Sequence, residues 1–110
     1  MFFEERRRRS RVQRKALLAL RTYARSISPE VEASASGTIR DGPGLLTIRM
    51  KTRTDTDRHR LADPAVARRL REILLEAGVS PSVARKVSFV FLSQETIDRE
   101  WSRDWRHTMS

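Results

Sequence analysis

The sequence predicts an α+β domain with a small three-stranded sheet and helices packed on one face, in the order α-β-β-α-α-β-α. A hydrophobic pattern of helical period covers residues 4–27. Strand-like alternation around a strong turn signal follows at 31–53, and a short apolar run stands at 87–92 after two helix-start signals. The 110 residues are enough for one compact domain and too few for two ordinary ones.

The first helix is expected over residues 4–27. Its apolar positions recur at helical spacing and share one face: Val12, Ala16, Leu20, Tyr23 and Ile27. Pro29 ends the helix, because the residue before a proline is pushed out of the α region. The run Arg6–Arg9 carries no apolar residue, so residues 1–11 are expected to be a flexible basic arm or a frayed helix start. Residues 12–110 then form a single α+β domain.

A β-hairpin is expected over residues 31–53. Apolar and polar residues alternate on both sides of Asp41–Gly44, which is a strong turn signal. Strand side chains alternate between faces, so one face of the second strand is apolar and the other carries Arg49, Lys51 and Arg53. The pattern therefore predicts a basic ladder on one side of the sheet.

The segment after the hairpin, residues 54–62, is polar and is expected to be a loop. A helix start follows at Asp63 and Pro64, since aspartate is a good N-cap and proline is favoured at the first helical position. Gly78 is a plausible residue to end that helix, because glycine tolerates the left-handed conformation of many helix ends.

The last part of the chain repeats the same kinds of signal. Ser80 and Pro81 predict a short helix through about Arg85. Residues 87–92 are apolar on both faces, which predicts a third strand that is covered on both sides. Ser93 is then expected to cap a last helix.

The order α-β-β-α-α-β over residues 12–92 resembles that of the type II KH domain and of the KH-like domain in bacterial replicative-helicase loaders of the DciA type. The resemblance implies a nucleic-acid-binding fold. KH domains clamp the nucleic-acid backbone with a GXXG loop between two consecutive helices, whereas this chain has Gly78-Val79-Ser80-Pro81 at that position. The proline has no backbone N–H to offer a phosphate, so no KH binding residue is carried over to this sequence.

The composition is strongly basic. Lys and Arg total 23 against 14 Asp and Glu, a formal net charge of +9, and only Lys15, Lys51 and Lys86 are lysines. The arginine fork suits phosphate oxygens, although the codon bias of a GC-rich genome would give the same excess. The chain has no cysteine, which excludes disulfides, thiolate metal sites and cysteine nucleophiles. We expect a cytoplasmic protein without a signal peptide or membrane helix.

Two basic clusters are candidate phosphate contacts, one before residue 16 and one along the hairpin and the segment after it. The predicted nucleic-acid-binding residues are Arg7, Arg8, Arg11, Arg14, Arg40, Arg49, Lys51, Arg53, Arg58 and Arg60. Aromatic residues make up 6% of the chain, which favours contact with the backbone over stacking on bases. An acidic protein is the alternative partner, and a solvated face that maintains solubility would show the same pattern.

Ile97, Trp101 and Trp105 stand four residues apart on one side of the last helix. This spacing is typical of a helix that packs on a sheet, and we expect that arrangement. If the sheet and the first helix bury each other instead, the three residues would form an interface with a protein partner or a second copy.

Asp55, Asp57 and His59 form a D-x-D-x-H run, which suggests a metal-dependent nuclease as a further hypothesis. No further acid-rich motif completes a ligand set, and nucleophile and phosphate-loop motifs are missing. We therefore expect no catalytic residue, metal or cofactor. The sequence favours a non-enzymatic nucleic-acid-binding or nucleoprotein-associated module, with a protein-interaction adaptor or small subunit of a larger complex as the alternative.

Overall fold

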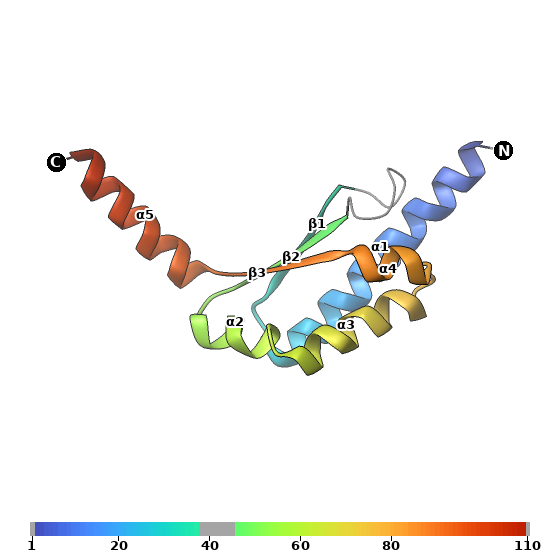
Figure 1. Cartoon of the computed structure of the whole chain (residues 1–110), viewed down its shortest axis with the longest axis horizontal. Coiled ribbons are helices and arrows are strands. Elements are labelled where there is room, and N and C mark those ends of the chain that lie inside the picture. The colour runs from blue at the N-terminus through green and yellow to red at the C-terminus, as the bar shows by residue number, and fades with distance from the viewer. Residues whose placement is uncertain (1, 38–45, 110) are drawn as a thin grey trace.

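The computed structural model describes the backbone of residues 2–37 and 46–109 and the side chains of residues 11–37 and 46–101. A three-stranded sheet has helices on one face, so the predicted α+β fold with a small sheet is confirmed (Figure 1). The elements are α1 (Phe2–Ile27), β1 (Glu32–Ser36), β2 (Thr47–Thr52), α2 (Asp55–Leu61), α3 (Pro64–Glu76), α4 (Pro81–Lys86), β3 (Ser88–Ser93) and α5 (Gln94–Met109).

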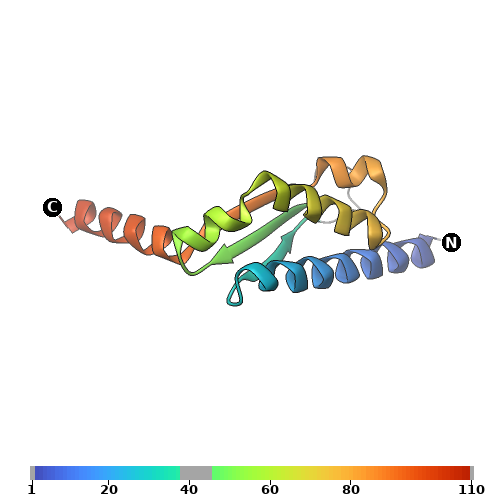
Figure 2. The same ribbon diagram turned by 90° about the horizontal axis from the view of Figure 1, so that it is seen from below.

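The sheet is mixed, with strand order β1-β2-β3. β1 pairs antiparallel with β2, as the predicted hairpin requires, and β2 pairs parallel with β3. The predicted turn at Asp41–Gly44 lies outside the described residues. Parallel neighbours need a long crossover, and here α2, α3 and α4 supply it. These helices all lie on the same side of the sheet (Figure 2).

The core lies between the sheet and the pair α1 and α3. Leu20 of α1, Ile48 and Met50 of β2, and Leu70 and Leu74 of α3 are almost completely buried. Strand alternation directs Ile48 and Met50 to the helical side, and helical spacing directs Leu70 and Leu74 to meet them. Each such side chain contributes about 1.5–3 kcal/mol on burial. The periodic apolar faces in the sequence therefore define the packed face of the sheet.

Two N-caps predicted from the sequence are confirmed. Asp63 Oδ1 accepts a hydrogen bond from the backbone N–H of Ala65 at 2.8 Å and begins α3. Ser93 Oγ accepts one from the N–H of Thr96 at 3.0 Å and begins α5. Each cap satisfies a backbone donor that the helix itself leaves unpaired.

The segment 54–62, predicted as a loop, contains the short helix α2, so that prediction is wrong. Thr54 is the N-cap, and its side chain accepts a hydrogen bond from Asp57 N at 3.2 Å. The negative charges of Asp55 and Asp57 lie in the first turn, where they interact favourably with the positive end of the helix dipole and stabilise the helix. Leu61 is fully buried and ties α2 to the core. A cap and one buried apolar residue thus support a helix in this polar segment.

β3 is an edge strand and is covered on one face only. Val90 is 36% exposed and Leu92 is half-buried, so the prediction of a strand covered on both faces is wrong. The physical reason is that the described helices form a single layer, on the side that Phe89 and Phe91 face.

α1 begins at Phe2, but the predicted division into an arm at 1–11 and a domain at 12–110 stays a prediction. α5 leaves the end of β3 and extends away from the sheet, which makes the molecule elongated (Figure 1). The radius of gyration is 16.1 Å, against about 13 Å for a compact domain of this length. Within the described ranges, no helix is both long and apolar enough to cross a membrane.

Gly78 ends α3 with a φ of +102°, a conformation that side chains with a Cβ disfavour. Gly78→Ala should lower the free energy of unfolding by about 1–2 kcal/mol in a urea titration. An added Cβ would meet Val12 at 3.8 Å, which is ordinary contact, so the loss would come from backbone strain. Gly78→Asn should lose less, because asparagine tolerates positive φ better. Equal losses in the two variants would contradict this explanation.

Candidate nucleic-acid interface

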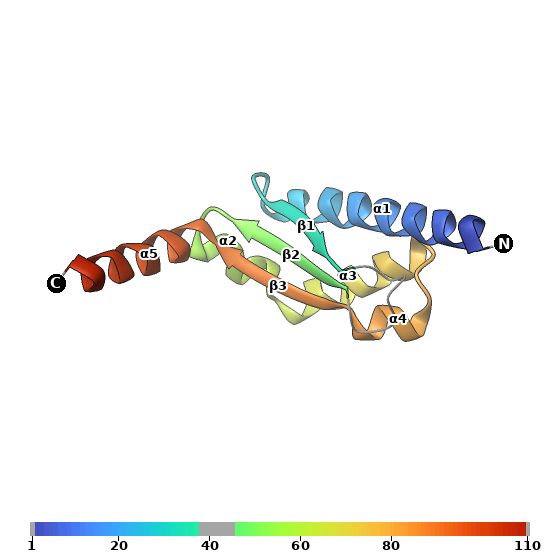
Figure 3. The same cartoon turned by 90° about the horizontal axis from the view of Figure 1, so that it is seen from above.

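The sheet face opposite the helices is open to solvent along the described parts of all three strands (Figure 3). Strand alternation and the pairing register determine which side chains share it. They are Glu32, Ser34 and Ser36 from β1, Thr47, Arg49 and Lys51 from β2, and Ser88, Val90 and Leu92 from β3. We call this set the open face.

Arg49 lies in the middle of the open face. It pairs in register with Ser34 on β1 and with Val90 on β3. In the neighbouring row on one side, Thr47 lies between Ser36 and Ser88, so four hydroxyl-bearing residues stand in these two rows. In the row on the other side, Lys51 lies between Glu32 and Leu92. The Arg49 side chain is exposed and, among the residues with described side chains, has no acidic or hydrogen-bonding partner.

The other two cations of the predicted ladder have acidic partners. Lys51 Nζ lies 3.4 Å from Glu32 Oε2, directly across the β1–β2 pair. Arg53, just beyond the end of β2, donates from Nη1 to both carboxylate oxygens of Glu30 at 3.1 Å. Both pairs are solvent-exposed and therefore weak, but they compensate the charge. The ladder is thus reduced to one uncompensated cation, Arg49.

The remaining predicted cations are not brought together with the open face. Arg58 and Arg60 lie on α2, where Arg60 pairs with Asp57 at 3.7 Å and Arg58 Nη2 lies 3.4 Å from His59 Nε2. α2 sits on the helical side of the sheet (Figure 2).

Arg11 and Arg14 are exposed on α1, which lies on the same side as α2. The side chains of Arg7 and Arg8 and the whole of Arg40 lie outside the described residues. The members of the predicted set with described side chains are therefore spread over several elements and do not form one patch.

Several arginines that the sequence did not single out hold the fold together. Arg21 and Arg25 of α1 donate to main-chain carbonyls of Ala33 and Val31, in and just before β1. Arg71 of α3 donates to two carbonyls around the end of α4, at 2.6 and 3.1 Å, and its guanidinium lies 5.2 Å from the centre of the Phe89 ring. Part of the arginine excess therefore satisfies buried or edge carbonyls.

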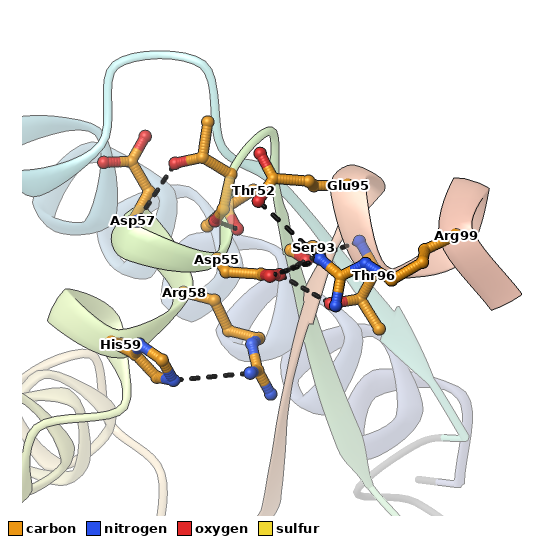
Figure 4. A network of polar contacts seen from close by, with 10 residues as sticks. Thr52, Asp55, Asp57, Arg58, His59, Ser93, Glu95, Thr96 and Arg99 are labelled. Atoms are coloured by element: carbon orange, nitrogen blue, oxygen red, sulfur yellow. Dashed lines mark hydrogen bonds and ion pairs between the residues drawn. The ribbon is translucent and has the colours of Figure 1, made fainter.

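A polar junction joins the start of α2 to the start of α5 (Figure 4). The Asp55 carboxylate accepts hydrogen bonds from the hydroxyls of Ser93 and Thr96 and, at 2.7 Å, from the guanidinium of Arg99. These bonds hold the pKa of Asp55 well below its usual range, and the hydrogen bond from Ser93 makes the largest contribution. Asp55 therefore joins the start of α2 to the first turns of α5.

The junction also accounts for the D-x-D-x-H run. The carboxylate of Asp55 is directed to α5, while Asp57 accepts a hydrogen bond from Ser28 Oγ at 3.2 Å. His59 is exposed next to Arg58. Within the described part of the chain, no three His, Cys, Asp or Glu side chains are grouped as a metal would need.

The exposed apolar residues of α5 do not pack on the sheet. Ile97 is 38% exposed and Trp101 is 68% exposed, so the expected core packing is wrong for these two residues. The side chain of Trp105 lies outside the described residues. The reason is positional: α1 and α3 already cover the packed face of the sheet, and α5 points away from both (Figures 1 and 3).

The hydroxyls of the open face were not identified as site residues from the sequence. Their signal was present, because Ser34, Ser36 and Thr47 occupy the polar positions of the predicted hairpin. The position of Ser88 beside Thr47 could not be predicted, because it depends on the parallel register of β2 and β3. The sequence singled out Asp55 for metal binding. Its contact with α5 was not foreseen, because Arg99 is 44 residues away in the sequence.

Comparison with known proteins gives no match among family models, curated proteins or solved structures.

Asp55 should titrate well below an aspartate in a short peptide, because hydrogen bonds stabilise its charged form. Since the folded-state pKa is lowered, the stability from these bonds is present above the ordinary carboxyl pKa of 3.8. It is lost as the pH falls from there toward the lowered value. An NMR titration of the side-chain carboxyl carbon should show this low midpoint, and a midpoint equal to that of the peptide would contradict the junction.

Asp55→Asn should loosen the attachment of α5, because it removes the charge-assisted bond to Arg99. Amide hydrogen exchange should accelerate over residues 94–100 and stay unchanged in β2. Asp98→Asn is the matched control, since Asp98 accepts a bond from Gln94 within α5 itself. The same acceleration in both variants would mean that Asp55 has no special role.

Proposed function

We propose that this chain is a non-enzymatic nucleic-acid-binding module that contacts the phosphate backbone through the open face of its sheet. The observation that carries the proposal is the position of Arg49, which is exposed, uncompensated among the described side chains and next to hydroxyl-bearing residues of its own row and of the row of Thr47. A guanidinium presents several donors in one plane and suits the oxygens of a phosphate. Serine and threonine hydroxyls are common additional donors to phosphate.

The residues of the open face favour backbone contact over base reading. Its described positions include no aromatic side chain on which a base could stack. Val90 and Leu92 offer apolar surface at the β3 edge that can lie against a sugar. Hydroxyls and a single guanidinium without aromatic platforms are therefore suited to a sequence-tolerant mode of binding.

Charge elsewhere in the chain supports an anionic partner. Arg85 and Lys86 are exposed in the last turn of α4, and Val87 separates them from Ser88, the first β3 residue of the open face. The formal net charge of +9 attracts a polyanion from a distance and speeds the encounter. The run Arg6–Arg9 adds cations near the start of α1. These charges would raise the local concentration of nucleic acid while Arg49 makes the contact.

Arg49→Gln should weaken binding to a single-stranded oligonucleotide in a salt titration followed by fluorescence anisotropy. The slope of log affinity against log salt should fall by about one, because one phosphate contact is lost. Circular dichroism should be unchanged, since the side chain is exposed.

Arg53→Gln and Arg69→Gln are controls with the same change in charge. Arg53 is paired with Glu30, and Arg69 is paired with Glu72 and Glu76 on α3. Both should keep most of the affinity and of the salt slope. Equal losses in all three variants would mean that net charge alone drives binding, and an unchanged Arg49→Gln would exclude the open face as the site.

A further inference from the structure

A second surface of the molecule is an apolar groove between α1 and α3. It has a volume of about 530 Å³. Its apolar walls are formed by Leu18, Ala19, Tyr23, Ile73 and Ala77. Leu18 is 60% exposed, which is unusual for a leucine at the contact of two helices. The two helices that line it lie on the helical side of the sheet, across the sheet from the open face (Figures 2 and 3).

α5 carries an apolar stripe, Ile97 and Trp101, that the described part of its own chain leaves partly exposed. Ile97 and Trp101 are one helical turn apart, and Trp101 is the most exposed large apolar side chain among the described residues. A tryptophan beside an aliphatic residue is a typical anchor for a groove in a partner.

The stripe and the groove cannot meet within one chain. α5 begins where β3 ends and points away from α1 and α3, as all three views of the ribbon show. The contacts of Asp55 with Ser93, Thr96 and Arg99 hold the helix in that direction. The groove can therefore receive this helix only from another molecule.

The charges beside the two surfaces are opposite. Two exposed acids, Asp98 and Glu100, lie between Ile97 and Trp101, although the chain as a whole is strongly positive. The arginine between them, Arg99, is already paired with Asp55. Acidic residues around an apolar stripe favour a groove with a basic rim.

The groove has such a rim. Lys15 lines it, and Arg14 stands one turn before Leu18 on the same side of α1. Neither cation has an acidic partner among the described side chains. The one acid in the groove lining, Glu76, is already paired with Arg69 at 2.8 Å.

We propose that Ile97 and Trp101 of one molecule dock into the α1–α3 groove of a second copy of the same chain. The acidic flank of α5 then faces Lys15 and Arg14. The two surfaces differ, so the association is head-to-tail, and each copy keeps one unused stripe or groove for the next. This self-association is independent of the nucleic-acid contact at Arg49.

The test is the mass of the full chain against concentration, measured by light scattering and sedimentation velocity without nucleic acid. The mass of the unchanged chain should rise above that of a monomer with concentration. Trp101→Ala, which removes the anchor, and Leu18→Glu, which puts an acid in the groove, should each stay monomeric. Both side chains are exposed, so circular dichroism should show that both variants fold.

Mixing the two variants separates this proposal from other modes of association. Trp101→Ala keeps an intact groove and Leu18→Glu keeps an intact stripe, so together they should form a dimer that grows no further. Leu75→Glu is the control, because Leu75 is 45% exposed on α3 and lies outside the groove lining. It should associate like the unchanged chain.

Three results would overturn the proposal: a monomeric unchanged chain at every concentration, a mixture that fails to dimerise, or a Leu18→Glu variant that still associates. Arg49→Gln should associate normally. A negative result for self-association would therefore not affect the proposed nucleic-acid contact. A negative result for the nucleic-acid contact would likewise not affect the proposed self-association.

Discussion

The rest of the structure depends on one constraint, which is that the helices cover only one face of the sheet. β2 and β3 are parallel, so the chain between them must cross over, and α2, α3 and α4 all lie on the crossover side. α1 joins the same side because its apolar face, with Leu20 at the centre, packs into that core. The other face must then meet water. Its hydroxyls and Arg49 follow from this constraint, and so does the exposure of Val90 on a strand that is otherwise apolar.

Some of the arginines contact other parts of the fold, and others are available to a partner. Arg21, Arg25 and Arg71 extend from helices to main-chain carbonyls, where a long side chain with several donors is useful. Arg53 and Arg69 are paired with glutamates on exposed surfaces. The formal charge of +9 therefore overstates the number of cations available to a partner. An uncompensated arginine such as Arg49 is informative because so many others have partners.

Features that depend on neighbours in sequence could be predicted, and features that depend on tertiary position could not. The caps at Asp63 and Ser93 and the apolar face of α1 involve residues within a few positions of one another. The compensation of Lys51 by Glu32 depends on the register of the β1–β2 pair, and the exposure of Trp101 depends on the direction in which α5 leaves the sheet. The helix α2 was not predicted because Leu61 is its one buried residue, and one apolar residue cannot show a helical repeat. Nucleic-acid binding itself remains a proposal.

The proposed phosphate contact through one arginine per molecule would be weak by itself, and the proposed self-association would strengthen it. The open face and the α1–α3 groove lie on opposite sides of the sheet, so filling one leaves the other accessible. Copies joined head-to-tail would hold several Arg49 side chains at a high effective concentration along one polyanion. Each contact would stay individually weak and sensitive to salt, while the array would bind more tightly than one copy. The direction of α5, which the contacts of Asp55 help to hold, would then govern the spacing of those contacts without touching the nucleic acid.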